Sequence, residues 1–139
     1  MPWIKTRSGG ARWEEPDALT VTLSLPARAL SPNARTHWAV KAKAVQAYRG
    51  EAKLLARVAI SEAGLDVPPG WGDEIMVRAT FWFRVERRRD RDNAQASLKS
   101  ALDGIAEAMG VDDSRFVMAP ATLLVDADNP RVEVALSRL

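Results

Sequence analysis

The residues of this chain most suited to chemistry are carboxylates grouped around one lysine. Asp90 and Asp92 stand one residue apart after a run of arginines, and the adjacent pair Asp112 and Asp113 follows further on. Side chains at i and i+2 of an extended segment point the same way, so Asp90 and Asp92 can aim at one point. Two crowded carboxylates repel each other, and a bound cation removes that repulsion. The spacing therefore predicts a divalent-metal site for phosphodiester chemistry.

The segment after the first aspartates reads as a helix. Asp92 and Asn93 are good N-cap residues, and Gly110 is a suitable helix stop. The apolar residues between them recur at helical spacing: Leu98, Leu102, Ile105 and Met109. Lys99 returns to the side of Asp92 after about two helical turns, and Asp103 lies one turn beyond it. We expect Asp103 to hold Lys99 in place, with its ammonium group leaning back towards the aspartates.

Each of these features also has a simpler explanation. Asp92 could be only a helix cap, the arginines only a solvated charged run, and the pair Asp112–Asp113 only a loop. A second Asp-x-Asp-Asn, Asp126–Asn129, is followed by Pro130, so a hairpin turn explains it. The first is followed by a helix that carries a lysine. The joint occurrence of these features favours the metal site.

Three elements follow one another in this stretch: Asp90–Asn93 (DRDN), Lys99–Gly104 (KSALDG) and Asp112–Ser114 (DDS). Nearer the amino end, Leu30–Arg35 (LSPNAR) precedes His37 and Trp38. Together they resemble the RusA-type Holliday-junction resolvases, which are crossover junction endodeoxyribonucleases of bacteria and their phages. The resemblance runs from about Leu19 to the carboxyl end. The gap between the DRDN element and the lysine is a few residues longer than in the shortest members of that family.

The resemblance implies a magnesium-dependent endonuclease, with Mn²⁺ as an alternative ion, that resolves four-way DNA junctions by paired symmetric nicks in recombination and repair. A homodimer would place one site on each of two equivalent strands. The expected metal ligands are Asp90, Asp92, Asp113 and, in reserve, Asp112. Lys99 would stabilise the transition state or orient the attacking water, completing a catalytic set with Asp90, Asp92 and Asp113. Asn93 and Asp103 would give structural support.

Basic residues cluster in two stretches that could form one phosphate-facing surface. The net charge is only +2, so the distribution of charge matters more than its total. Contacts with the DNA backbone are expected from Arg87, Arg88, Arg89 and Arg91 in one stretch, and from Asn33, Arg35, Lys41 and Lys43 in the other. Lys53 fits a solvated helix face better. Two other functions stay open: a catalytically inactive DNA-binding accessory protein of the same fold, and an acidic scaffold with no nucleic-acid role.

With 139 residues, of which 47% are hydrophobic, the chain suits one domain. We expect a flexible leader over residues 1–17 and a single domain over 18–139. Its predicted elements are a strand at Leu19–Leu25, a long helix from about Thr36 to Ala63, a strand at Glu74–Val85, the site helix, and a final hairpin of Phe116–Val125 and Arg131–Leu136. The expected fold class is α/β (α+β), with a mixed sheet of about four strands and two helices packed on it.

Composition and motifs exclude several other kinds of site. The chain has no cysteine and one histidine, which removes thiolate nucleophiles, zinc–thiolate sites and histidine clusters. It has no phosphate-binding glycine motif, so no nucleotide cofactor is expected. No segment has the apolar length of a membrane span or the core of a signal peptide, and we expect a cytoplasmic protein without a membrane partner.

Overall fold

The computed structural model describes residues 3–5, 11–13 and 17–139. Within the predicted leader, β1 (Trp3–Lys5) and β2 (Ala11–Trp13) pair antiparallel, with Trp3 opposite Trp13. The expectation that residues 1–17 are flexible otherwise falls on residues outside this description.

A mixed sheet of five strands forms the centre of the fold, as expected for an α+β domain. Its strands are β3 (Ala18–Leu23), β4 (Ile75–Phe83), β5 (Phe116–Met118), β6 (Thr122–Val125) and β7 (Arg131–Arg138). Strand β7 lies between β3 and β4 and is antiparallel to both. The short strands β5 and β6 pair parallel with successive parts of the other edge of β4. The sheet is therefore four strands wide, as predicted.

The predicted final hairpin is wrong, because β6 and β7 do not pair. Strand β4 lies between them and takes β6 on one edge and β7 on the other. The chain turns across the end of β4, where the Asp126 N–H donates to the Phe83 carbonyl at 2.8 Å. The predicted turn itself is confirmed, since the Asp126 carboxylate accepts from the Asp128 and Asn129 N–H groups at 3.2 Å. Both edges of the long strand β4 are therefore paired, with β5 and β6 on one side and β7 on the other.

The part of the chain that the structure describes has three α-helices, because the predicted site helix is divided in two: α1 (Trp38–Ala63), α2 (Arg91–Ala96) and α3 (Lys99–Met109). Two short 3₁₀ turns, η1 (Arg28–Leu30) and η2 (Asp113–Arg115), lie in the connections. Helix α1 begins after His37, whose Nδ1 accepts from the Ala39 N–H at 3.2 Å. Gly64 and Gly110 end α1 and α3 in the left-handed conformation, which glycine adopts without steric cost.

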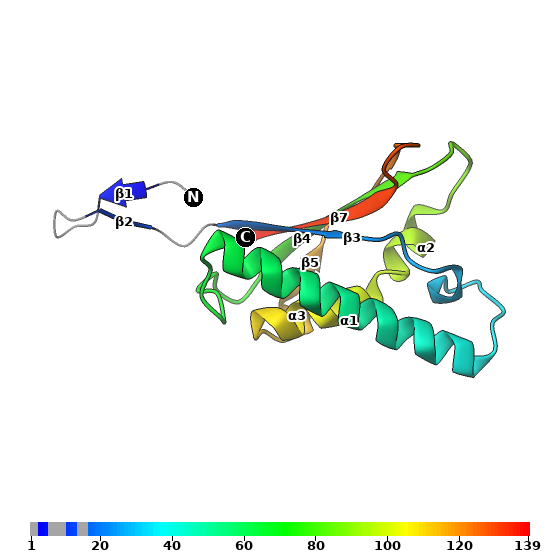
Figure 1. The fold of residues 1–139 in the computed structure, drawn as a ribbon, viewed down its shortest axis with the longest axis horizontal. Helices are drawn as coiled ribbons and strands as arrows, with labels where there is room; N and C mark the ends of the chain where they lie inside the picture. The colour runs from blue at the N-terminus through cyan, green and yellow to red at the C-terminus, as the bar shows by residue number, and fades with distance from the viewer. Residues whose placement is uncertain (1–2, 6–10, 14–16) are drawn as a thin grey trace.

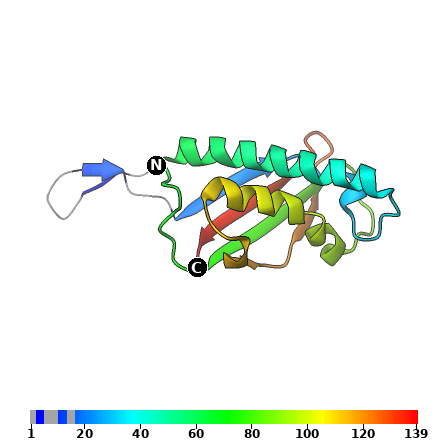
Figure 2. The same ribbon diagram turned by 90° about the horizontal axis from the view of Figure 1, so that it is seen from below.

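The core lies between one face of the sheet and the helices α1 and α3, which cover the same face (Figures 1 and 2). The side chains that β4 contributes to it include Ile75, Val77, Ala79 and Phe81, as its alternation predicts. Most residues of α3 are buried, and Ile105 and Met109, together with Leu98 just before the helix, are inaccessible. Burial of this large apolar surface fixes the position of α3, and with it the polar residues on its outer side.

The predicted single site helix is interrupted at Ser97 and Leu98. The Leu98 N–H bonds to the Gln95 carbonyl, three residues back, and the Ser97 hydroxyl bonds to the Ala94 carbonyl. Leu98 is completely buried, so packing of this residue into the core competes with continuation of the helix. Lys99 therefore does not lie two turns after Asp92 on one continuous helix, as the sequence predicted.

Candidate metal and nucleic-acid site

The first acidic pair lies at the start of α2. Asp90 is extended (φ −85°, ψ 119°), and its Oδ1 accepts from the Asn93 N–H at 3.1 Å. Asp90, rather than the predicted Asp92 or Asn93, is thus the N-cap. Asp92 lies exposed in the first helical turn, where its negative charge suits the helix dipole. Asn93 does support Asp90, but through its main chain.

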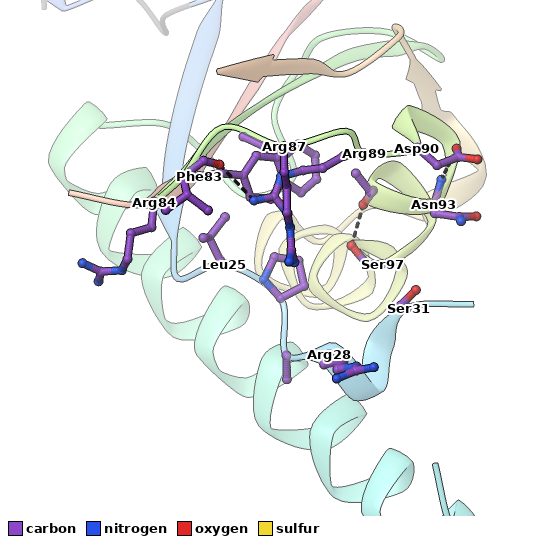
Figure 3. Close-up of a pocket in the computed structure, with 15 residues that line it drawn as sticks. Leu25, Arg28, Ser31, Phe83, Arg84, Arg87, Arg89, Asp90, Asn93 and Ser97 are labelled. Carbon is purple, nitrogen blue, oxygen red and sulfur yellow. Dashed lines mark hydrogen bonds between the residues drawn. The ribbon is translucent and has the colours of Figure 1, made fainter. Parts of the chain in front are cut away.

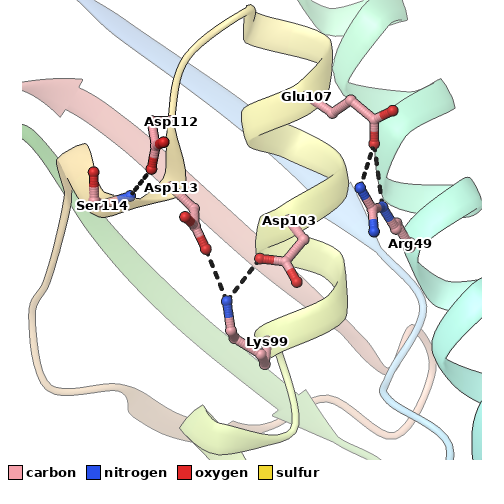
Figure 4. Close-up of polar contacts among 7 residues, drawn as sticks. All are labelled: Arg49, Lys99, Asp103, Glu107, Asp112, Asp113 and Ser114. Atoms are coloured by element: carbon pink, nitrogen blue, oxygen red, sulfur yellow. Dashed lines mark hydrogen bonds and ion pairs between the residues drawn. The ribbon is translucent and has the colours of Figure 1, made fainter.

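The second acidic group surrounds Lys99 at the start of α3. The Lys99 Nζ lies 2.8 Å from Asp103 Oδ1 and 2.8 Å from Asp113 Oδ2 (Figure 4). The predicted contact between Lys99 and Asp103, one turn apart, is confirmed. The contact with Asp113 joins the beginning of α3 to the 3₁₀ turn that follows its end. Two of the sequence elements that suggested the site therefore meet at one ammonium group.

The charges in this cluster stabilise one another. The hydrogen bond from the Lys99 ammonium is the main cause that holds the pKa of Asp113 below its ordinary value. Hydrogen bonds to Asp103 and Asp113 raise the pKa of Lys99. Both shifts have the sign expected of opposite charges in contact. Because the pKa of Lys99 is raised, this lysine stays protonated at neutral pH and acts as a fixed cation, not as a base.

Asp112 has a local structural role. Its Oδ1 accepts from the Ser114 N–H at 2.8 Å and so caps the 3₁₀ turn η2 (Figure 4). Within residues 3–5, 11–13 and 17–139, no three carboxylate or histidine side chains lie close enough together to hold one metal ion. The acidic residues form two sets, because Asp90 and Asp92 lie at the start of α2 and Asp103 and Asp113 both contact Lys99. Asp92 is helical, so the extended segment that was expected to aim Asp90 and Asp92 at one point is not present.

A groove of about 720 Å³ opens beside Asp90 (Figure 3). Its apolar part includes Leu25, Pro26, Phe81 and Phe83, and its polar rim includes Arg28, Arg84, Arg87, Arg89, Asp90 and Asn93. Strand β4 ends at the groove, and the chain then runs along its rim into α2. In Figure 3, Arg87 reaches from this segment towards the loop that carries Arg28, whereas Arg84 points away. We call this space the arginine groove.

Arg89 is held in place within the arginine groove. Its guanidinium carbon lies 3.8 Å from the centre of the Phe83 ring, and its Nη2 donates to the Val85 carbonyl at 3.1 Å. Burial, and then the charge of Arg87, lower the pKa of Arg89. In the described residues, none of the four arginines of the groove forms an ion pair with a carboxylate. This concentration of unneutralised positive charge favours an anionic ligand.

The opposite wall of the groove is tied to α1. The Tyr48 hydroxyl donates to the Ser24 carbonyl at 2.8 Å, and the Ser24 hydroxyl and N–H both donate to the Glu51 carboxylate, at 2.7 and 2.9 Å. Burial raises the pKa of Tyr48, so the phenol remains a donor. These contacts hold the end of β3, and therefore the adjoining Leu25 and Pro26, against the helix.

The other basic residues predicted to bind DNA are placed differently. Arg88 and Arg91 are exposed beside the groove but do not line it. Asn33 and Arg35 line a second, smaller cavity of about 460 Å³ that shares Arg28 and Ser31 with the arginine groove. A third cavity of about 250 Å³ brings Lys41 together with Lys99 and Asp103. Lys43 is exposed on α1.

Several residues of the site were missed by sequence reasoning. Arg28 stands alone in a proline-rich loop, and Phe83 belongs to the apolar face of a strand, so neither pattern suggests a binding residue. Arg84 belongs to the basic cluster that precedes the aspartates, which was a usable signal. Lys53, expected to be solvated, forms an ion pair with Glu107 of α3 at 2.9 Å, and Arg49 does the same. These lysine and arginine contacts join α1 to α3.

Comparison with known proteins finds a similar sequence but no assigned activity. No family model matches the chain. The chain is 41% identical over 101 residues, 73% of its length, to an uncharacterized protein of Xylella fastidiosa, and it spans 64% of that protein's length.

Two solved structures resemble the chain weakly. An OmpA-like domain of FopA1 from Francisella tularensis has a TM-score of 0.35 at 13% identity, covering 91% of this chain and 79% of its own. A cyanuric acid hydrolase from A. caulinodans has a TM-score of 0.36 at 15% identity, covering 91% of this chain and 40% of its own.

None of the helices in the described residues has the length and apolar character needed to cross a membrane.

Proposed function

We propose that the protein is a magnesium-dependent endodeoxyribonuclease that acts on branched DNA, with the four-way junction as its substrate. The observation that carries this proposal is the contact of Lys99 with Asp103 and Asp113. It joins two of the three sequence elements that resemble the junction resolvases. The third element, which begins at Asp90, borders a groove rich in arginine. Acidic and basic groups lie side by side, as a site for metal-assisted phosphodiester hydrolysis requires.

The donor chemistry at α2 fits Mg²⁺, and Mn²⁺ by the same argument. One oxygen of Asp90 accepts the Asn93 N–H, which leaves the second oxygen available, and the Asp92 carboxylate is exposed. Mg²⁺ is commonly bound through one or two carboxylates, with water and substrate phosphate as the other ligands. Asp90 and Asp92 would hold the ion, whereas Asp113, also predicted as a ligand, pairs with Lys99, and Asp112, predicted in reserve, caps η2. The bound ion would supply an activated water and offset phosphate charge.

The side chains of the chain would perform the remaining tasks. Lys99, kept protonated by its two carboxylates, would donate to a non-bridging phosphate oxygen as negative charge develops there. Arg87 would hold the DNA backbone beside Asp90, and the positive charges of Arg87 and Arg89 would also offset repulsion between the phosphates and the acidic residues. Lys41, which shares a cavity with Lys99 and Asp103, would extend this positive surface.

Paired nicks need two sites related by symmetry. We therefore propose a homodimer, in which each subunit cuts one of two equivalent strands. A role in DNA recombination and repair in the cytoplasm follows from this substrate.

The two Asp-x-Asp-Asn segments provide a matched test. Asp92→Asn changes the proposed metal site, whereas Asp128→Asn makes the same change in the turn between β6 and β7. Both side chains are exposed, so neither change should unfold the protein. With a labelled four-way junction and Mg²⁺, we expect Asp128→Asn to cut like the wild type. Asp92→Asn should bind the junction but lose cleavage by roughly two orders of magnitude or more.

Cleavage retained in Asp92→Asn would reject the metal assignment.

The separation of the acidic residues into two sets favours a second candidate, a DNA-binding accessory protein of the same fold that does not cut. That candidate predicts junction binding by the wild type and no nicked product at any Mg²⁺ concentration.

A further inference from the structure

We propose that the arginine groove binds one unpaired nucleotide of the DNA substrate. The base would lie on the stacked pair of Phe83 and Arg89, and the phosphate would lie between Arg28 and Arg87. This inference rests on the proposed function only in that the nucleotide belongs to DNA. It assigns to the groove a task that is separate from cutting, namely selection of DNA in which a base is already free.

The size and lining of the groove fit a nucleotide. Its volume of about 720 Å³ lies within the usual range for small-molecule pockets, which is roughly 300–1,000 Å³. One part of its lining is apolar, formed by Leu25, Pro26, Phe81 and Phe83, and the rest is polar and cationic. A nucleotide has the same division between a flat base and a charged phosphate. A groove that bound only the outside of a duplex would have no use for the apolar part.

The stacking surface is already assembled. The rings of Phe81 and Phe83 are nearly parallel, with centres 5.7 Å apart, and the Arg89 guanidinium lies over Phe83 at 3.8 Å. The hydrogen bond from Arg89 to the Val85 carbonyl fixes the orientation of this guanidinium plane. Unstacked bases bind to aromatic rings and to arginine planes of this kind. Little side-chain freedom would be lost on binding, because the contact already exists.

The polar residues of the rim would bind the phosphate and the edge of the base. Arg28 and Arg87 face the groove from two different segments, and neither forms an ion pair among the described residues. A phosphate between them would satisfy both guanidinium groups. Asn93 also lines the groove, and its side-chain amide can both donate to and accept from the edge of a base. A base paired within a duplex could not reach these groups without leaving its stack.

A binding assay with EDTA, which prevents cutting, tests the inference. Fluorescence anisotropy would compare a labelled single-stranded dT oligomer with a blunt duplex of equal total charge, using the full chain. We expect the single strand to bind at least about fivefold more tightly, the lower limit for stacking of one base. Phe83→Leu keeps an apolar side chain but removes the ring, and should weaken single-strand binding by about fivefold or more.

Two arginine substitutions complete the test. Arg87→Ala removes a charge from the groove, and Arg57→Ala removes one from an exposed position on α1 outside it. Only Arg87→Ala should reduce single-strand binding, by about fivefold or more. If Phe83→Leu lowers the melting temperature so far that its binding cannot be interpreted, the comparison of Arg87→Ala with Arg57→Ala decides.

Equal affinity for the two DNAs, or equal losses in Arg87→Ala and Arg57→Ala, would overturn the inference. Those results leave the proposed nuclease intact if the wild type still cuts a junction in Mg²⁺. Conversely, selective single-strand binding without cleavage supports the nucleotide site and removes the nuclease.

Discussion

Replacing Gly104 by alanine should separate the two helices that carry the candidate site. Gly104 lies on α3, where it faces α1 across a close contact. A methyl group there would overlap the Arg49 carbonyl oxygen and lie 3.1 Å from the Lys53 backbone nitrogen. Backbone atoms within a helix cannot move aside as the end of a flexible side chain can. The helices must therefore shift apart, at a cost of about 1–3 kcal/mol for overpacking.

Gly50 offers a matched control on the facing helix. It lies within α1, and a methyl group added there would meet nothing within 4 Å. Alanine at an open helical position is more favourable than glycine by about 0.5–1 kcal/mol. The same chemical change is thus expected to have opposite signs at Gly50 and Gly104. The helical gain is common to both positions, so the free energies of unfolding of the two variants should differ by about the overpacking cost of 1–3 kcal/mol.

Urea denaturation followed by circular dichroism measures this difference directly. The ion pairs of Glu107 with Arg49 and Lys53 should also weaken, because they join α3 to α1 across the same contact. If Gly104→Ala is as stable as Gly50→Ala, the close contact between α1 and α3 is wrong. The packing of α3 on α1, which positions Lys99 and Asp103, would then also be wrong.

Two further predictions concern single contacts. Lys99→Met should raise the pKa of Asp113, observed by carbon NMR of the carboxyl group, because Lys99 is the main cause of its low value. In the wild type, the stabilisation from this contact should be lost as the pH falls below the ordinary aspartate pKa of 3.8, or as it rises above the ordinary lysine pKa of 10.5. The free energy of unfolding should therefore show no step from this pair between about pH 5 and 9. An Asp113 carboxyl resonance that does not shift in Lys99→Met would refute the contact. Tyr48→Phe should cost about 1 kcal/mol in urea unfolding by removing the bond to the Ser24 carbonyl, and an unchanged midpoint would show that this bond does not hold the end of β3.

The elements with strong periodic patterns could be predicted from the sequence. The alternation in β3 and β4 and the long alanine-rich segment of α1 each specify one element, because burial of a single face determines them. The helix break at Ser97 could not be predicted in this way, since Leu98 fits the helical period on either side of it. The pairing of β7 with β4 rather than β6 depends on contacts between distant segments, which local patterns do not contain.

In the candidate site, too, contacts within one element could be predicted and contacts between distant segments could not. The contact between Lys99 and Asp103 follows from spacing within one helical turn, and it was predicted. The position of Asp113 at the same ammonium group depends on how the chain folds back after Gly110. The arginine groove was missed because Arg28 comes from a separate loop and Phe83 has the pattern of a core residue. Only the folded chain brings these segments together.

The most direct test of the proposed activity is single-turnover nicking of a synthetic four-way junction across a range of Mg²⁺ concentrations. We expect the wild type to release paired nicked strands only when Mg²⁺ or Mn²⁺ is present. Asp90→Asn, which keeps an acceptor for the Asn93 N–H but removes the charge, should bind the junction without nicking it. An intact junction in every wild-type reaction, or equal nicking by Asp90→Asn, would contradict the account.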